Sequence, residues 1–252
     1  MAGAIRIGIG GWTFAPWRGS FYPESLKQKD ELAFATRALT AIEINGTYYS
    51  GFRPETFAGW ASAAPEDFAY SAKANKFCTN KKVLADAGAS IEKFFSQGID
   101  RLEDKLGPIL WQFAHTKKFD RDDFSRFLDL LPKRLGERPL RHALEVRHES
   151  FRDEKFIELA RDHGVAICLS DHPVYPMIDE PTANFAYARL MRGTEDEPTC
   201  YPPADIESWA KRLSQAAGDG RDVFAFFISG GKPRAPFGAR AMQEALGLTP
   251  PA

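Results

Sequence analysis

The amino-acid sequence predicts a single (β/α)8 barrel. Short apolar runs, rich in β-branched and aromatic residues, alternate along the chain with amphipathic stretches. This alternation favours right-handed βαβ units and a parallel sheet. Eight such runs occur in a chain of 252 residues, which is the usual length of one closed α/β barrel. Several runs are apolar on both faces, as expected for parallel strands that are covered on both sides.

The predicted strands and helices alternate along the chain. The strands are expected at Ile5–Gly10, Ala41–Asn45, Ala69–Lys73, Ile109–Phe113, His142–Arg147, Val165–Ser170, Phe185–Met191 and Val223–Ser229. The helices are expected at Leu26–Leu39, Pro54–Ala64, Ile91–Leu106, Asp122–Leu131, Glu154–His163, Asp205–Ala217 and Ala239–Leu246. Pro54 suits the first turn of its helix, and Asp153 and Asp205 suit N-terminal caps or first turns.

The sixth connection breaks this regularity. Residues 172–184 contain Pro173, Pro176 and Pro181, so a long helix is not expected there and the barrel is predicted to be irregular at this point. No internal repeat, low-complexity tract or linker divides the chain. We therefore expect one domain over residues 1–252.

Composition excludes several classes of partner. The 33 basic and 34 acidic residues give a net charge of −1, so no bulk attraction to nucleic acid or an anionic membrane is expected. The three cysteines include no Cys-x-x-Cys pair, which argues against a disulfide framework or a structural zinc site. The start of the chain lacks a signal-peptide pattern, and the longest apolar run, Val223–Ile228, is too short to cross a bilayer. These features predict a cytoplasmic protein.

Polar residues gather at the C-terminal ends of the predicted strands, where (β/α)8 barrels place their functional sites. Glu43 and Asn45 lie two residues apart and so share a face, as do Glu145 and Arg147. The remaining members of this group are Ser71, Lys73, Gln112, His148, Asp171, Tyr187, Arg189 and Met191. The sequence therefore predicts a ring of charged residues around one mouth of the barrel.

This ring has two interpretations. Its three acids and three bases sum to zero, so they could pair as a structural plug: Glu43, Glu145, Asp171, Lys73, Arg147 and Arg189. Buried ion networks, however, are a poor source of net stability, because desolvation can cost more than pairing returns. We therefore favour functional use of the ring.

Acid–base chemistry is the best supplied. Glu43 and Glu145 are carboxylates, Lys73 is a base if it is desolvated, and His148 is of the residue type that most often transfers protons in enzymes. These four are the candidate catalytic residues. No Gly-x-Ser-x-Gly motif occurs, and Cys168 lies within an apolar strand, as expected of a core residue.

A metal site is the weaker interpretation. Glu145, His148 and Asp171 are metal-ligand types at strand ends, but the neighbouring lysine and arginines would compete for the same carboxylates. We expect no cofactor and assign no residue to a metal.

Two groups of glycines suggest different roles, one in the backbone geometry and one in ligand binding. Gly8, Gly10 and Gly11 do not match the dinucleotide-binding fingerprint, so they indicate a tight turn or a close backbone approach. After the eighth strand, Gly230 and Lys232 belong to a Gly-Gly-Lys loop, and such loops bind phosphate in many barrels. A phosphate or carboxylate ligand and a solvated basic loop remain equal alternatives there.

Aromatic residues cluster after the first two strands and include Trp12 and Tyr48. They either pack the barrel mouth or line a pocket that stacks a ligand.

The same segments carry a family resemblance. Ile7-Gly8-Ile9-Gly10-Gly11-Trp12, with Trp17-Arg18-Gly19-Ser20-Phe21-Tyr22-Pro23, resembles the opening of the YecE-like proteins, known as domain of unknown function 72. Four later segments are similar to motifs of that family: Glu43-Ile44-Asn45-Gly46-Thr47-Tyr48-Tyr49, Ser71-Ala72-Lys73-Ala74, Asp104-Lys105-Leu106-Gly107-Pro108 with Gln112, and Glu145-Val146-Arg147-His148-Glu149-Ser150-Phe151.

The resemblance implies a barrel related to the triosephosphate isomerase fold, and it supplies no activity. It also implies that the family's characteristic pocket contains Glu43, Asn45, Lys73, Glu145, Arg147 and His148. Departures from the family pattern fall at the rim, at Asn80, Met191 and Ser229, so ligand choice can differ from that of relatives.

Three functions follow from these observations. The first is an enzyme of unassigned reaction that acts on a small, polar, anionic metabolite. Its ligand-binding residues would be Asn45, Gln112, Arg147, Asp171, Arg189, Trp12, Tyr48, Gly230 and Lys232. The alternatives are a non-catalytic ligand-binding or scaffold barrel and, less favoured, a metal-dependent hydrolase or isomerase. The sequence does not define the reaction or the oligomeric state.

Overall fold

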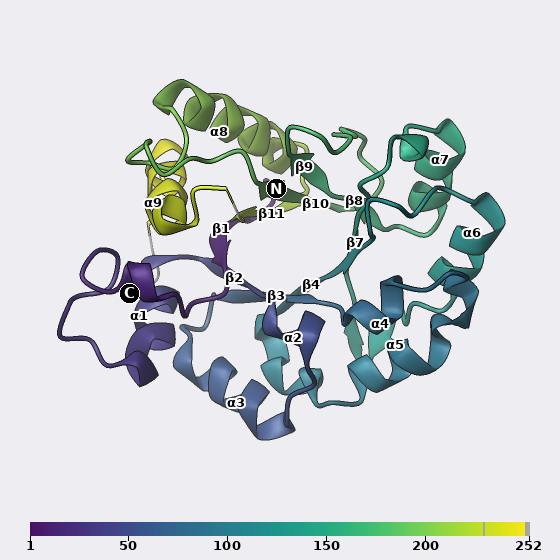
Figure 1. Cartoon of the computed structure of the whole chain (residues 1–252), viewed down its shortest axis with the longest axis horizontal. Helices are drawn as coiled ribbons and strands as arrows, with labels where there is room; N and C mark the ends of the chain where they lie inside the picture. Colours follow the sequence, from purple (N-terminus) through teal and green to yellow (C-terminus); the bar gives the residue numbers. More distant parts are fainter. Residues whose placement is uncertain (229, 250–252) are drawn as a thin grey trace.

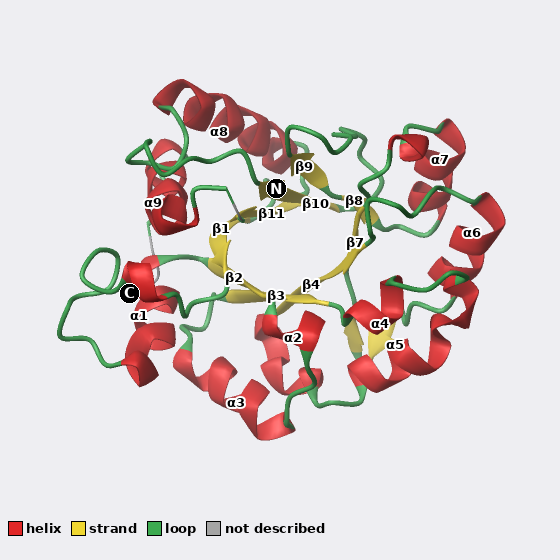
Figure 2. Cartoon of the chain, viewed as in Figure 1, coloured by secondary structure: helices red, strands yellow, loops and turns green. Residues whose placement is uncertain are grey.

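A computed structural model describes residues 1–228 and 230–249. The strands form a ring of parallel neighbours with helices packed around the outside (Figures 1 and 2). Their order is β8-β7-β4-β3-β2-β1-β11-β10-β9. The predicted (β/α)8 barrel is confirmed, because β8 and β9 are two halves of the sixth barrel strand.

All eight predicted strands are found, with small changes at their ends. The barrel strands are β1 (Ile5–Gly10), β2 (Ala41–Ile44), β3 (Ala69–Lys73), β4 (Leu106–Gln112), β7 (His142–Glu145), β8 (Ala166–Ile167), β9 (Leu169–Asp171), β10 (Phe185–Leu190) and β11 (Asp222–Phe227). A separate antiparallel hairpin consists of β5 (Arg134–Leu135) and β6 (Arg138–Pro139). Ser229, the predicted end of the last strand, lies outside the described residues.

The helices also match the predicted segments, with two short additions after β2 and β3. They are α1 (Glu31–Ala38), α2 (Gly46–Tyr49), α3 (Pro54–Ala63), α4 (Lys76–Thr79), α5 (Gly88–Phe95), α6 (Arg121–Asp129), α7 (Glu154–Asp162), α8 (Pro203–Gly218) and α9 (Ala235–Ala245). Short 3-10 turns lie at Ala15–Trp17, Gln28–Asp30, Leu84–Ala87, Ile99–Lys105, Glu149–Phe151 and Lys232–Arg234. Asp153 caps α7 by accepting a hydrogen bond from the Lys155 amide, as predicted.

The helix predicted over Ile91–Leu106 was too long. It is broken at Gly98, whose φ of 97° is left-handed, and a 3-10 segment follows. The α-carbon of Pro54 packs so closely that a Cβ on Gly98 would lie 2.7 Å from it. The chain therefore turns at Gly98 where the start of α3 crosses it.

The sixth strand closes the barrel in two pieces. β8 pairs with β7, and β9 pairs with β10, with Cys168 between them. The Cys168 amide continues the β7 ladder by donating to the Leu144 carbonyl at 2.9 Å. Within the described residues no helix lies between β9 and β10, so the predicted irregular sixth connection is confirmed. Thr182 from this connection accepts a hydrogen bond from the Ile167 amide instead.

Two apolar layers lie on opposite sides of the barrel wall. The larger packs the outer face of the strands against the helices and is rich in aromatic rings. The smaller fills the barrel interior and includes Leu110, Cys168, Phe224 and Phe226. Gly8 lets β1 approach β2, because a Cβ there would lie 1.9 Å from the Ala41 carbonyl oxygen. The close-approach interpretation of the first glycine group is therefore confirmed.

Candidate functional site

A buried arginine joins two buried carboxylates at the C-terminal end of the barrel. Arg189, from β10, donates from Nε and Nη2 to the two carboxylate oxygens of Glu43 at 3.1 and 3.0 Å. Its Nη1 donates to Oε2 of Glu145 on β7. Glu43 and Glu145 are 0% exposed and Arg189 is 2% exposed. Strands far apart in sequence are thus linked across the barrel.

Two further side chains hold Glu145. Arg147 donates from Nε to Oε1 at 2.8 Å, and the Gln112 amide donates to Oε2 at 2.8 Å. Burial alone would raise the pKa of Glu145, but the charges of Arg189 and Arg147 and the Gln112 hydrogen bond lower this pKa to about 2. Glu145 is therefore a permanent anion at neutral pH.

The network continues downward into the barrel core. The Tyr187 hydroxyl donates to Oε2 of Glu43 at 2.7 Å. The Ser71 hydroxyl lies 2.7 Å from the Tyr187 hydroxyl oxygen. Burial, then the charge of Glu43, raises the pKa of Tyr187 well above its ordinary value. Tyr187 is thus a neutral hydrogen-bond donor that fixes Glu43.

Lys73, at the end of β3, is held differently from the two arginines. Its side chain is nearly buried, the residue being 6% exposed, and its Nζ lies 4.1 Å from the centroid of the Tyr48 ring. Among the described residues no carboxylate lies within ion-pair distance of this nitrogen. Burial, then the charge of Arg189, lowers the pKa of Lys73 to about 8, although Glu43 and Glu145 oppose the shift.

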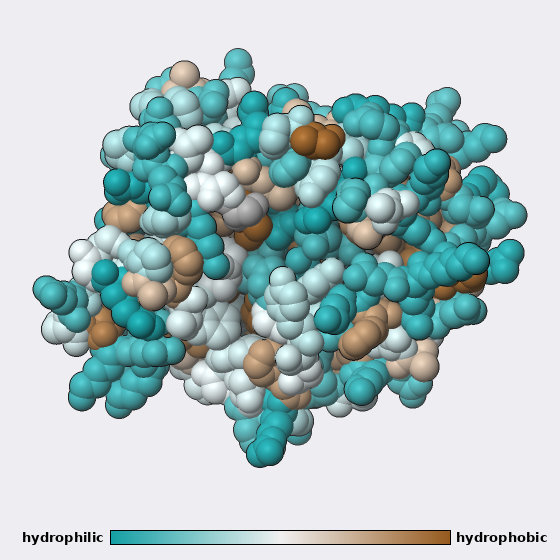
Figure 3. Space-filling model, in the orientation of Figure 1, coloured by the Kyte–Doolittle hydropathy of each residue, from teal (hydrophilic) through white to brown (hydrophobic). Residues whose placement is uncertain are grey.

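The ring of charged residues has two layers, which correspond to its two interpretations as a structural plug and as a functional site. The lower layer, Glu43–Arg189–Glu145, fills the barrel and is sealed from solvent. The upper layer contains Lys73 and the partly exposed Arg147. Together the two layers carry three positive and two negative groups, so they have one excess positive charge while Lys73 is protonated. Viewed as in Figure 1, the centre of this face shows hydrophilic residues beside paler and hydrophobic ones (Figure 3).

The sixth connection supplies two rim residues that the sequence analysis left unassigned to the site. The ring of Tyr175 lies 4.7 Å from the Arg147 guanidinium carbon and stacks on the His172 imidazole at 3.7 Å. Burial and the charge of Arg147 lower the pKa of His172. The only sequence signal was the position of this segment after a strand, because its prolines allow no element to be predicted.

Two predicted site residues are not brought into this network. Asp171 points away from the barrel axis, where it accepts hydrogen bonds from Nε of Arg192 at 2.5 Å and from the Trp209 indole at 3.2 Å. His148 accepts a hydrogen bond from the Ser150 amide at 3.1 Å through Nδ1. Asp171 therefore ties the strand to α8, and His148 caps the turn after β7.

Asn45 and Trp12, two further predicted ligand-binding residues, lie outside the charged network. Asn45 follows β2, and its amide nitrogen would lie 2.8 Å from a Cβ at Gly10, so the glycine leaves room for it. Trp12 packs edge-on against Trp60 of α3 at 5.1 Å and so belongs to the outer layer. Of the two rim departures that the structure describes, Asn80 is an exposed residue after α4 and Met191 is buried.

Two backbone amides of the glycine loop after β11 are hydrogen-bonded to carbonyl groups of the protein. The Gly231 amide donates to the Gly193 carbonyl at 2.6 Å, and the Lys232 amide donates to the Gly230 carbonyl at 2.6 Å. The Lys232 ammonium lies 4.4 Å from the Phe14 ring centroid. These two amides are thus already satisfied, and Lys232 is fixed on the rim.

Metal-ligand side chains are dispersed over residues 1–228 and 230–249. No three His, Cys, Asp or Glu side chains in that part of the chain form a group that could hold a metal ion. No helix there is long and apolar enough to cross a membrane.

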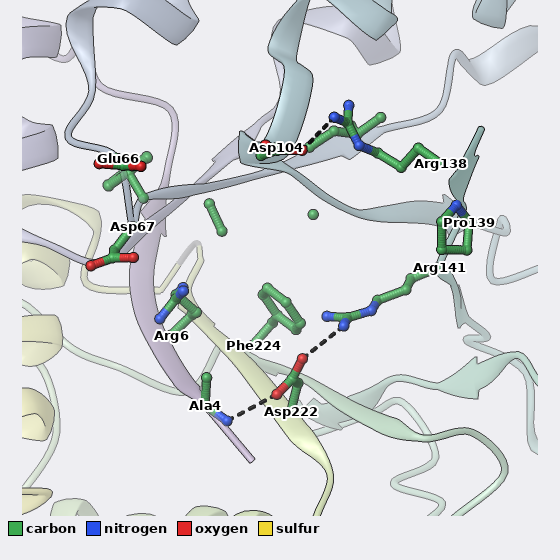
Figure 4. A pocket seen from close by; sticks show the side chains of 14 residues that line it. Ala4, Arg6, Glu66, Asp67, Asp104, Arg138, Pro139, Arg141, Asp222 and Phe224 are labelled. Carbon is green, nitrogen blue, oxygen red and sulfur yellow. Dashed lines mark hydrogen bonds and ion pairs between the residues drawn. The ribbon is translucent and has the colours of Figure 1, made fainter. Parts of the chain in front are cut away.

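The opposite end of the barrel contains an open cavity of about 490 Å³ (Figure 4). Four of its charged residues form two ion pairs: Arg138 with Asp104 at 2.6 Å, and Arg141 with Asp222 at 2.7 Å. The Phe224 ring lies behind Arg141, with its centroid 5.6 Å from the guanidinium carbon. The two ends thus use the same residue types in different settings.

The fold and the network define an α/β barrel whose C-terminal mouth is closed by a buried arginine–carboxylate cluster. The chain belongs to the family described as Protein of unknown function DUF72, which it matches over residues 6–252. The resemblance noted from the sequence is therefore confirmed. No curated protein is similar enough in sequence to match the chain.

Solved structures of that family share the whole fold. A DUF72 family protein from Thermotoga maritima is 25% identical, with a TM-score of 0.80 over 97% of this chain and 99% of that one. One from Enterococcus faecalis is 16% identical, with a TM-score of 0.75 over 97% and 96% of the two chains. SacUVDE is 9% identical, with a TM-score of 0.61 over 96% and 99%, which shows a likeness of fold alone.

Proposed function

We propose that this protein is an enzyme that acts on a small, polar, anionic metabolite at the C-terminal mouth of the barrel. The observation that carries the proposal is Lys73, a nearly buried cation for which the described residues provide no ion-pair partner. Removing an ammonium from water without pairing it destabilises a protein. Such a residue is typical of a site that uses the charge or the basicity of its amine.

Two cations supply the binding face for the anion. Arg147 contacts the Glu145 carboxylate through Nε and Nη2. The described residues provide no partner for its Nη1. Burial, then the charge of Arg189, lowers the pKa of Lys73, and the charge of Arg147 acts in the same direction. An anion between Lys73 and Arg147 would offset the one excess positive charge of the ring.

We assign the two carboxylates a positioning role rather than proton transfer. Glu43 and Glu145 are each held by Arg189, and Glu145 has a pKa of about 2. A group with so low a pKa is a poor proton donor or acceptor at neutral pH. Lys73, with a pKa of about 8, is the better proton-transfer group, and the carboxylates position the arginines.

Ligand-dependent thermal shifts test this proposal. Pyruvate, sulfate and inorganic phosphate, each titrated separately, should raise the melting temperature of the protein through binding to the folded state. Lys73→Met and Arg147→Met should abolish the shift. Lys76→Met is the matched control, because its ammonium lies beside Phe77 on the neighbouring helix, and it should leave the shift intact.

The outcomes separate the alternatives. A shift that survives both Lys73→Met and Arg147→Met but disappears in Lys232→Met would place the anion at the glycine loop and contradict the proposal. A ligand that binds through Lys73 but is never converted, with products followed by mass spectrometry, would favour a non-catalytic binding barrel.

A further inference from the structure

The Nζ atom of Lys73 has an unusual environment for a lysine amine. It lies over the ring of Tyr48, at the C-terminal end of β3. Lys117 shows the ordinary arrangement: its ammonium donates to Asp123 at 2.8 Å and to the Lys82 carbonyl at 3.0 Å. Hydrogen bonds of that kind stabilise the charged form. The Tyr48 ring also attracts the ammonium of Lys73, but it does not occupy the amine lone pair once the proton has left.

A lysine in such a setting is a nucleophile as well as a base. Amines attack carbonyl groups only when neutral, and desolvation increases the neutral fraction. With a pKa of about 8, about one tenth of Lys73 is neutral at pH 7. A lysine with an ordinary pKa would be neutral in far fewer than one molecule in a hundred.

We propose that Lys73 forms a covalent imine with the carbonyl carbon of a small 2-oxo acid, whose carboxylate is held by Arg147. This inference rests on the proposed function, because it assigns the substrate class of that same site. In a 2-oxo acid the carbonyl and the carboxylate are adjacent, which suits an amine and a guanidinium that face one mouth.

The covalent step balances without a further reactant. The ammonium of Lys73 loses a proton to solvent, and the free amine adds to the carbonyl carbon to form a carbinolamine. The hydroxyl group of that intermediate takes up a proton and leaves as water, and a carbon–nitrogen double bond forms. The products are a protonated imine and one water molecule, with no oxidant or reductant consumed.

The buried carboxylates suit this product. The protonated imine has the same charge as the ammonium it replaces, so Glu43 and Glu145 continue to face one cation at Nζ. Because Arg189 holds both carboxylates in place, their negative charge is preorganised before the imine forms.

Reductive trapping tests the inference. The whole protein is incubated with pyruvate and sodium cyanoborohydride, digested, and analysed by mass spectrometry. The peptide that contains Lys73 should gain one carboxyethyl group, at least tenfold faster than the peptides that contain Lys76 or Lys117. Lys73→Arg should show no such preference, and Arg147→Met should reduce trapping at Lys73.

Lactate provides the control that separates this inference from the proposed function. It carries the carboxylate without the carbonyl, so it should compete with pyruvate and form no adduct. If pyruvate raises the melting temperature through Lys73 but labels all lysines equally, the imine is wrong and the anion site stands. If pyruvate neither binds nor labels Lys73 selectively, both the imine and a pyruvate-binding mouth are wrong.

Discussion

The two ends of the barrel use the same chemistry in opposite environments. At the N-terminal end, the side chains of Arg141 and Asp222 are 38% and 31% exposed and form an ion pair beside an open cavity. At the C-terminal end, Arg189 and its two carboxylates are almost completely buried. Water screens the first pair, whereas the second cluster is surrounded by protein. Burial therefore decides which charges matter for stability and for pKa values.

Removing the central arginine should have the largest effect. Arg189→Met leaves Glu43 and Glu145 without the cation that they share, and breaking a buried ion pair in this way costs about 3–5 kcal/mol of the free energy of unfolding. Urea denaturation measures the loss. Adding Glu43→Leu and Glu145→Leu should recover part of it, because no buried carboxylate that has lost the Arg189 cation then remains. A loss below about 1 kcal/mol would contradict the structural role of the lower layer.

Removing the buried lysine should have the opposite sign. The pKa of Lys73 is about 8 in the folded protein and 10.5 ordinarily, so the ammonium disfavours folding at pH 7. Lys73→Met should therefore raise the free energy of unfolding by about 1–3 kcal/mol. The gain is complete below pH 8 and should shrink as the pH rises to about 10.5, where the lysine is neutral in both states. A loss of stability at pH 7 would indicate that Lys73 belongs to the structural plug.

Anion affinity at the C-terminal mouth should depend on pH. Because Lys73 loses its proton as the pH rises through about 8, pyruvate should bind about tenfold more weakly at pH 9 than at pH 7, a change of about 1.4 kcal/mol. Competition by lactate follows the same profile. Lys73→Arg, which stays charged, should flatten it. A pH-independent affinity in the unmodified protein would mean that the anion binds elsewhere.

The smallest effect is expected at the opposite end. Arg141→Ala breaks the solvent-exposed pair with Asp222, and such pairs contribute about 0–1 kcal/mol. Thermal unfolding at low and high salt measures this, and most of any loss should vanish at high salt. Pyruvate binding should be unchanged. A loss above about 2 kcal/mol would show that the two ends do not differ as described.

Much of the site was visible in the sequence because strand geometry is regular. Alternation along a strand places residues two apart on one face, so Glu145 and Arg147 were correctly expected together. The same rule explains Asp171. Cys168 belongs to the apolar layer inside the barrel. Asp171 lies three residues later and therefore on the outer face, where it accepts a hydrogen bond from the Trp209 indole. Attention to that odd spacing would have excluded Asp171 from the mouth.

The pairing pattern was not visible. Nothing in the sequence indicates that one arginine would bind both carboxylates, or that Lys73 would have no ion-pair partner among the described residues. Both depend on how far side chains reach across the barrel. The loop contacts were also hidden. Tyr175 reaches Arg147 from a proline-rich segment, and loops of that kind follow no period from which a contact could be predicted.

The divided sixth strand has a consequence for how the protein moves. Every other barrel strand has at least four residues, whereas the ring closes here through the two residues of β8 and the three of β9. The β7–β8 ladder joins two residue pairs, whereas each of the other barrel ladders joins at least three. Local opening of the native state starts at such weak points. Amide hydrogen exchange at residues 166–171 should therefore be faster than in β1 to β4. The barrel should open first between β7 and β10, where β8 and β9 lie.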